Sequence, residues 1–253
     1  KADYTVYFYT QFSKPLKDYG VWTAAIPAGM SRKRESVTSE PYQKIVAEAK
    51  ILKNQKSFQG KHIGFFTEFA TADKEQVLMK TGISFTSQAG AKANLNQEIK
   101  GWDFDGLHQA AVDLWNKALS KIKIEGGTKE EKTVFYTALY HTMIDPRNVT
   151  DVNGQYLGGD GIIHEAKHFT KRTIFSGWDV FRSQMPLQTI INPALVSDLI
   201  NSLITLSDQT DSGYLPRWEI LNAYSGCMIG NPAVSVIADA YAKGIRSYNQ
   251  QKE

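Results

Sequence analysis

Residues 173–193 and 213–232 read TIFSGWDVFRSQMPLQTIINP and GYLPRWEILNAYSGCMIGNP. Each segment carries a tryptophan followed by a carboxylate, with an arginine nearby: Trp178-Asp179 with Arg182, and Trp218-Glu219 with Arg217. Carboxylates accept hydrogen bonds from hydroxyls, guanidinium groups donate to ring oxygens, and an indole face covers the apolar C–H face of a pyranose. The combination favours a neutral, hydroxyl-rich ligand such as a sugar.

A structural interpretation of the same residues is equally consistent with their spacing. Ser176 precedes Asp179 by three residues, which is a variant of the capping box and predicts a helix that begins after Ser176. Trp178 and Met185 would then be core residues of that helix. Composition and spacing alone leave the choice between binding and packing open.

The totals describe an ordinary globular chain with room for one large domain or two smaller ones. The 253 residues are 42% hydrophobic and 22% charged, and the net charge is only +3, too weak a field to indicate a nucleic-acid partner. The basic run Arg32-Lys33-Arg34 is typical of a solvated loop. The single cysteine, Cys227, excludes an internal disulfide, and no run of about 18 apolar residues predicts a membrane span.

The first ninety residues predict antiparallel β structure. Runs rich in aromatic and β-branched residues recur between polar connections without a βαβ rhythm. The strands are expected at residues 4–12, 20–23, 61–69 and 76–85. Residues 41–59 carry mixed charge and give no clear assignment.

From about residue 89 the hydrophobic period becomes helical. Helices are expected over 91–99 and 107–119, after the capping box formed by Thr128 and Glu131, after Ser176, and after Asn192-Pro193 and Asn231-Pro232. Helices in series with long loops suggest an α/α toroid. A closed toroid of about twelve helices needs more than ~160 residues, so we expect either an open bundle or a piece of a longer protein.

The chain strongly resembles glycoside hydrolase family 92, the calcium-dependent exo-acting α-mannosidases. The matching segments are MKTGISF (79–85), GWDFD (101–105), EGGTKEEKTVFYTALYHTMIDPRNVTDVNGQY (125–156), FSGWDVFRSQMPL (175–187), LPRWEI (215–220) and SGCMIGNPAVSVIADAYAKGI (225–245). The resemblance implies an α+β multidomain fold, a β-sandwich followed by part of an (α/α)6 barrel. We expect part of the sandwich in residues 1–88, a linking helical region in 89–105 and the first part of the barrel in 106–253.

The resemblance also implies a secreted or periplasmic enzyme that hydrolyses terminal α-mannosides, such as α-1,2-linked mannose of N-glycans, with inversion. Inversion requires a general acid and a general base. The family's acid lies in a Glu-Gly-containing segment and its base in a Gly-Asn-Asp-Asp-like segment, and neither occurs in residues 1–253. The catalytic residues and the calcium ligands therefore stay unidentified, and we expect this chain to be inactive without the rest of its polypeptide.

The resemblance carries only the binding residues that are present. The candidates for shaping a mannose subsite are Trp178, Asp179, Arg182, Arg217, Trp218, Glu219, Cys227 and Met228. For Glu219 a buried carboxylate that pairs with Arg217 or binds a hydroxyl is favoured over an acid catalyst. A non-catalytic carbohydrate-binding module remains the alternative function.

A second motif points to another class of enzyme. His164, Glu165 and His168 match the zincin pattern H-E-x-x-H, which on a helix places two imidazoles on one face beside a carboxylate base. A zincin helix is usually buried, whereas glycines precede this motif and basic residues follow it. A zinc peptidase is therefore the less favoured alternative.

Overall fold

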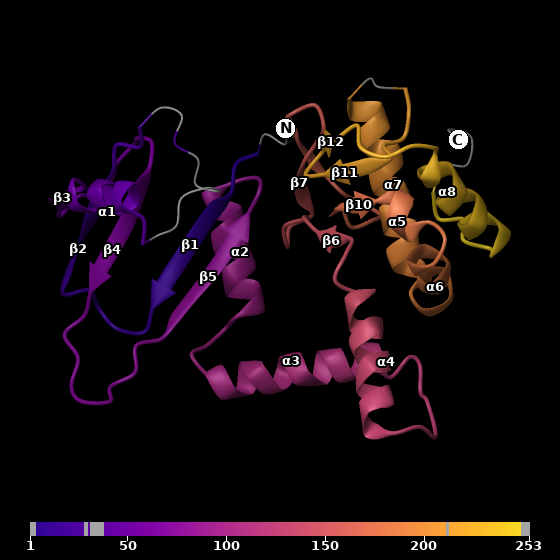
Figure 1. Cartoon of the computed structure of the whole chain (residues 1–253), viewed down its shortest axis with the longest axis horizontal. Coiled ribbons are helices and arrows are strands. Elements are labelled where there is room, and N and C mark those ends of the chain that lie inside the picture. Colours follow the sequence, from indigo (N-terminus) through magenta and orange to yellow (C-terminus); the bar gives the residue numbers. More distant parts are fainter. Residues whose placement is uncertain (1–3, 28–29, 31–37, 211–212, 249–253) are drawn as a thin grey trace. The chain divides into compact units, whose positions relative to one another are not determined.

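The computed structural model describes residues 4–27, 30, 38–210 and 213–248, so the basic run Arg32–Arg34 lies outside the described residues. The chain forms two compact units (Figure 1). One unit comprises Gln11–Met79, and the other comprises Lys1–Thr10 together with Lys80–Glu253. In the described part of the chain, no helix has both the length and the apolar character needed to cross a bilayer.

The unit Gln11–Met79 is built on an antiparallel sheet in the order β3-β2-β4. Its elements are β2 (Asp18–Thr23), α1 (Glu40–Ala47), β3 (Lys50–Lys53) and β4 (Ile63–Glu68). Helix α1 begins where the Ser39 hydroxyl accepts a hydrogen bond from the Tyr42 amide at 3.4 Å. The predicted strands at 20–23 and 61–69 are confirmed, and the unassigned residues 41–59 supply α1 and β3.

The second unit begins with two paired strands and a helix. Strand β1 (Tyr7–Phe12) pairs with β5 (Met79–Ser84), and α2 (Gln88–Glu98) follows. Gly82 lets the helix lie close to β5, because a Cβ at this position would be 2.2 Å from the carbonyl oxygen of Ala91. The change from strands to helices predicted near residue 89 is confirmed, because β5 ends at Ser84 and α2 begins at Gln88.

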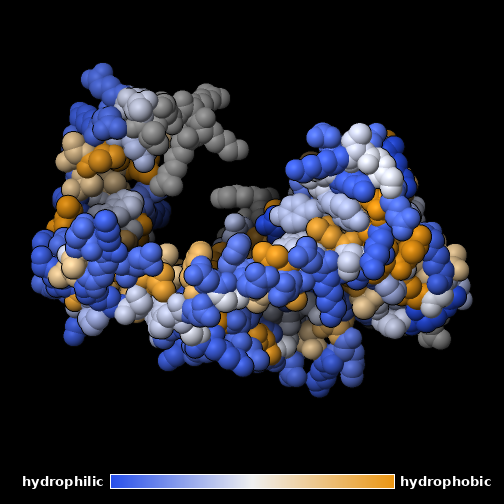
Figure 2. All heavy atoms as spheres, turned by 90° about the horizontal axis from the view of Figure 1, so that it is seen from below, coloured by the Kyte–Doolittle hydropathy of each residue, from blue (hydrophilic) through white to orange (hydrophobic). Residues whose placement is uncertain are grey.

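Helices α3 (Phe104–Leu119) and α4 (Lys129–His141) follow. The capping box of α4 is confirmed: the Thr128 amide donates to Glu131 at 2.7 Å, and the Glu131 amide donates to the Thr128 hydroxyl at 3.2 Å. The helix predicted over 107–119 is confirmed as α3, but no residue of this helix is buried and Leu114 is 70% exposed. Hydrophobic side chains accordingly reach the molecular surface (Figure 2).

Two short antiparallel pairs occupy residues 147–173. Strand β6 (Arg147–Asn148) pairs with β9 (Arg172–Thr173), and β7 (Gln155–Leu157) pairs with β8 (Ile163–Glu165). His164 and Glu165 lie in β8, where consecutive side chains point to opposite faces. The structure therefore contradicts the less favoured H-E-x-x-H alternative, which requires a helix, and the His164 ring nitrogen contacts Asp160 at 2.8 Å.

The rest of this unit is mainly helical around a small sheet. The elements are β10 (Phe175–Ser176), α5 (Gly177–Val180), α6 (Gln184–Ile191), α7 (Pro193–Gln209), β11 (Trp218–Ile220), β12 (Ala223–Tyr224) and α8 (Pro232–Ala242). The core packs α7 against α8 and α6, with buried apolar side chains such as Ile200, Leu203 and Val236. Helices α7 and α8 start at prolines as predicted, but neither preceding asparagine caps its helix through the side chain.

Candidate functional site

Strand pairing brings the two Trp-carboxylate motifs together. In the antiparallel pair β10–β11, Phe175 lies opposite Glu219 and Ser176 lies opposite Trp218. The Gly177 amide extends the contact by donating to the carbonyl oxygen of Arg217 at 3.0 Å. Segments about forty residues apart in the sequence are thus neighbours, and β10, β11 and α5 are drawn side by side in Figure 1.

Gly177 permits this close approach. A Cβ built there would lie 2.7 Å from the Phe175 ring, 2.7 Å from the Pro232 ring and 2.8 Å from the carbonyl oxygen of Arg217. All three distances are shorter than a side chain tolerates. The position therefore requires glycine, and it joins the start of α5, the segment before β11 and the start of α8.

The first motif lies on and just after the short helix α5. The Ser176 hydroxyl donates to the Asp179 carboxylate, and no side-chain hydrogen bond from Ser176 caps the helix backbone. The helix predicted to begin after Ser176 is confirmed, but the capping-box hydrogen bond to the helix backbone is not formed. Trp178 is partly exposed, whereas Asp179 and Arg182 are exposed and accessible to a ligand.

Arg217 organises the loop that follows the second motif. Its Nε donates to the Tyr224 hydroxyl at 2.6 Å, its Nη1 donates to the carbonyl oxygen of Met228, and its guanidinium carbon lies 5.6 Å from the centre of the Tyr224 ring. These contacts replace the expected pairing of Arg217 with Glu219. They also fix the segment that carries Cys227, which is exposed together with Met228.

Two tyrosines join this cluster that the sequence reasoning did not select. The Tyr214 and Tyr224 rings meet edge to face, with centres 5.6 Å apart and planes at 66°. Both residues flank the LPRWE segment, in GYLPRW and NAYSG. Aromatic residues repeated around a Trp-carboxylate pair are a signal that would have found them.

The Glu219 carboxylate lies inside the protein, with 2% of the residue exposed. It accepts hydrogen bonds from the Thr173 hydroxyl at 2.8 Å, the Ile174 amide at 3.0 Å and the Asn222 amide at 2.7 Å. Ile174 and Asn222 have φ of 68° and 65°, a region that a β-branched residue such as isoleucine rarely adopts. The carboxylate thus holds two left-handed turns in place on either side of the β10–β11 pair.

Burial dominates the electrostatics of Glu219 and of a nearby lysine. Burial raises the pKa of the Glu219 carboxyl, although its hydrogen bonds and the positive charge of Lys171 oppose the change. Lys171 is 1% exposed and donates to the carbonyl oxygen of Ser202 at 3.0 Å. Burial lowers the pKa of Lys171 to about 8, and the charge of Glu219 opposes this shift. Each buried charge therefore partly compensates the other.

The described residues do not make up a calcium site. Calcium takes six to eight oxygen ligands, usually including several carboxylates. Across the ranges that the structure describes, no group of three or more histidine, cysteine, aspartate or glutamate side chains is placed to hold a metal ion. The residues present therefore do not fit the calcium that the family resemblance implies.

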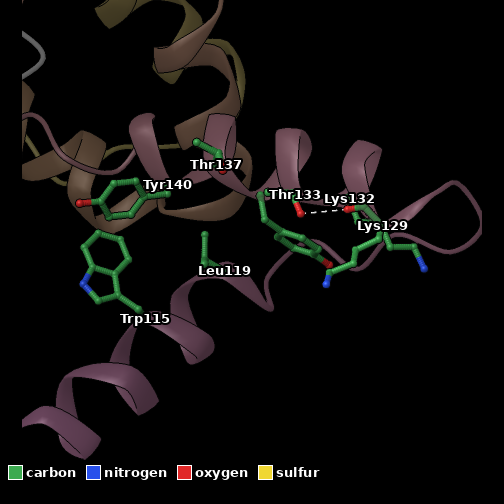
Figure 3. A pocket seen from close by; sticks show the side chains of 8 residues that line it. Trp115, Leu119, Lys129, Lys132, Thr133, Thr137 and Tyr140 are labelled. Carbon is green, nitrogen blue, oxygen red and sulfur yellow. Dashed lines mark hydrogen bonds between the residues drawn. The ribbon is translucent and has the colours of Figure 1, made fainter.

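Two cavities lie on different elements from the two motifs. A groove of about 630 Å³ between α3 and α4 is lined by Trp115, Leu119, Lys129, Lys132, Thr133, Tyr136, Thr137 and Tyr140. In the close view, Trp115 and Tyr140 lie next to each other, and their ring centres are 4.5 Å apart (Figure 3). A cavity of about 820 Å³ lies in the unit Gln11–Met79 and is lined mainly by apolar residues, including Trp22 and Phe66.

Two domain models of one protein family together match nearly the whole chain. Residues 1–84 match the glycosyl hydrolase family 92 N-terminal domain, and residues 90–253 match the glycosyl hydrolase family 92 catalytic domain. A curated protein from Arthroderma benhamiae, described as an uncharacterized secreted glycosidase, is 30% identical over 82 residues, which are 31% of this chain and 11% of that protein.

Two solved structures from Bacteroides thetaiotaomicron are similar over the full length of this chain. A family GH92 α-mannosidase is 29% identical with a TM-score of 0.78, over 98% of this chain and 31% of its own, and it has also been solved with mannoimidazole. A family GH92 inverting mannosidase is 27% identical with a TM-score of 0.82, over 100% of this chain and 31% of its own. The chain thus spans less than a third of the length of these relatives.

Proposed function

Because this chain belongs to glycosyl hydrolase family 92, we propose that it is part of an exo-acting α-mannosidase that releases terminal α-linked mannose from glycans with inversion. The observation that carries this proposal is the likeness of 98% or more of the chain to two solved mannosidases. One of them is described as inverting, and a curated relative is described as secreted. We extend these properties to the complete polypeptide, with N-glycan mannose such as the α-1,2-linked unit as substrate and a secreted or periplasmic location.

The proposal includes the architecture of the complete enzyme. We assign residues 1–88 to a β-sandwich, residues 89–105 to a linking region and residues 106–253 to the first part of an (α/α)6 barrel. The antiparallel sheet β3-β2-β4 and the serial helices α6, α7 and α8 support this division. The exposed apolar side chains of α3 also support it, because such a surface is normally covered by a partner.

Within the proposed mannose subsite the residues have different tasks. Asp179 and Arg182 are exposed and supply an acceptor and donors for sugar hydroxyls. The indoles of Trp178 and Trp218 supply apolar faces, and the exposed loop of Cys227 and Met228 borders the ligand.

Arg217 and Glu219 stabilise the segments that carry these contacts. Two N–H groups of Arg217 donate to Tyr224 and Met228, and these bonds fix the loop that carries Cys227 and Met228. Its other N–H groups would donate to a sugar oxygen. Glu219 acts indirectly. Its carboxylate accepts hydrogen bonds from the protein and stabilises the turns that carry the subsite.

The chemical step needs groups that this chain has not been shown to contain. Inversion uses an acid and a base whose carboxyl groups lie about 6.5–9.5 Å apart, so that a water molecule fits between the base and the sugar. We place both groups in the remainder of the polypeptide, as the family resemblance implies. The role of this chain is therefore to bind and orient mannose.

The test compares this chain with the complete polypeptide. Mannose release from α-1,2-linked mannobiose is expected from the complete protein and not from residues 1–253 alone. Release by the highly purified 253-residue chain would contradict the division of labour, and no release by the complete protein would contradict the enzymatic proposal. Mannose binding without any hydrolysis by the complete protein would instead favour the carbohydrate-binding module. The zinc peptidase has lost its structural basis, because its motif lies in strand β8.

A further inference from the structure

The geometry points to Tyr214 and Tyr224 as a second sugar-contact site, which binds the sugar unit linked to the mannose. This inference rests on the proposed function, because it assumes that mannose lies beside Arg217 and the two tryptophans. It goes beyond that function by assigning recognition of the next ring to a pair of tyrosines outside the Trp-carboxylate motifs.

The tyrosine pair consists of an exposed ring, Tyr214, and a partly buried ring, Tyr224, held in a defined arrangement. Tyr214 is 54% exposed, and its ring meets the Tyr224 ring edge to face at 5.6 Å. The Arg217 guanidinium lies over the Tyr224 ring, so the aromatic surface that a ligand can contact is mainly that of Tyr214. Tyrosine loses little conformational entropy on binding, which makes it an effective contact residue for a ligand.

Arg217 ties this aromatic pair to the proposed mannose subsite. It donates through Nε to the Tyr224 hydroxyl and through Nη1 to the carbonyl oxygen of Met228. Tyr224 also lies opposite Glu219 in the β11–β12 pair, so the buried carboxylate and the tyrosine share one hairpin. Movement of Tyr224 relative to the subsite is thereby restricted by two contacts.

The surface next to the tyrosines has the composition of a sugar site. Met228 and Ile229 are exposed apolar residues on the loop that Arg217 holds. Apolar and aromatic surface accepts the C–H face of a pyranose, and tyrosine hydroxyls and guanidinium groups bond its oxygens. The chemistry therefore suits a neutral second sugar.

The experiment compares two ligands on this 253-residue chain: methyl α-mannoside, which has one ring, and α-1,2-linked mannobiose, which has two. Binding is measured by NMR titration. We expect wild-type protein to bind mannobiose about five- to ten-fold more tightly, as one aromatic contact would provide. Tyr214→Ala should abolish this preference and leave the affinity for methyl α-mannoside within about two-fold, whereas Tyr214→Phe should retain the preference.

Tyr241→Ala is the matched control, because Tyr241 is 45% exposed but lies on α8 against Arg246. This variant should keep the wild-type preference. Equal affinity of wild-type protein for the two ligands, or a preference that survives Tyr214→Ala, would overturn the second site while leaving the mannose subsite intact. Failure of wild-type protein to bind either ligand would overturn both. Thermal unfolding midpoints close to wild type show that a lost preference does not come from misfolding.

Discussion

Replacing Gly177 by alanine should destabilise the unit that contains the candidate site. The added Cβ would lie within 2.8 Å of three groups: the Phe175 ring, the Pro232 ring and the carbonyl oxygen of Arg217. A proline ring and a backbone carbonyl cannot rotate away, so the segments on which they lie must shift. Overpacking of this kind typically costs about 1–3 kcal/mol, and three simultaneous contacts place the expected loss near the upper end of that range.

Urea denaturation followed by tryptophan fluorescence measures this loss. Four of the five tryptophans lie in the unit that contains Gly177, since only Trp22 lies in Gln11–Met79. Gly101→Ala is the matched control, because the nearest atom to its added Cβ is 4.0 Å away and its stability should change by less than about 1 kcal/mol. Equal unfolding midpoints for Gly177→Ala and Gly101→Ala would refute the close-approach argument. The same displacement should weaken mannoside binding by Gly177→Ala, because it separates Asp179 from Arg217.

Four further outcomes are expected. Burial lowers the pKa of Lys171 from 10.5 to about 8. The stability supplied by its neutral amine is therefore complete above pH 10.5 and lost as pH falls through 8. In urea titrations, the free energy of unfolding of wild-type protein relative to Lys171→Met should rise by about 3 kcal/mol between pH 7 and pH 10.5. Burial raises the pKa of Glu219 above 4.5, so the stability supplied by its protonated form is complete below about pH 4.5 and is lost as pH rises through the folded pKa. The stability of wild-type protein relative to Glu219→Gln should therefore fall as pH rises above about 4.5, and a rise would contradict the reasoning. Thr128→Ala should cost about 1 kcal/mol in the same assay, because it removes the cap of α4, and an unchanged midpoint would show that the cap is dispensable. Calcium or a chelator should leave the melting temperature of this chain unchanged, and a calcium-dependent rise would reveal a site that the described residues do not show.

Local signals in the sequence predicted much of the fold. The capping box marked the start of α4, because its two hydrogen bonds join Thr128 and Glu131, which are three positions apart. The prolines after Asn192 and Asn231 marked the starts of α7 and α8, because proline suits the first helical position. The switch from strands to helices near residue 89 followed from the hydrophobic period in the same way. The long motif segments were specific enough to indicate the family, which the profile match then established.

Local signals failed where the outcome depended on contacts between distant segments. Residues 164–168 fit a helical zinc motif, but pairing with β7 made them part of a hairpin. The apolar stripe of α3 predicted burial, but burial requires a partner surface, which the described residues do not supply.

The candidate site shows the same division most clearly. Trp178, Asp179, Arg217 and Trp218 were recognisable as sugar-binding residue types from their order in the chain alone. The antiparallel register of β10 and β11 is a long-range property, set by packing and hydrogen bonding across about forty residues. That register buried Glu219 among backbone amides, turned Arg217 toward Tyr224 and made Gly177 the point of contact. The sequence alone determines which residue types are present, whereas their burial and their hydrogen-bond partners are determined only when distant segments pack together.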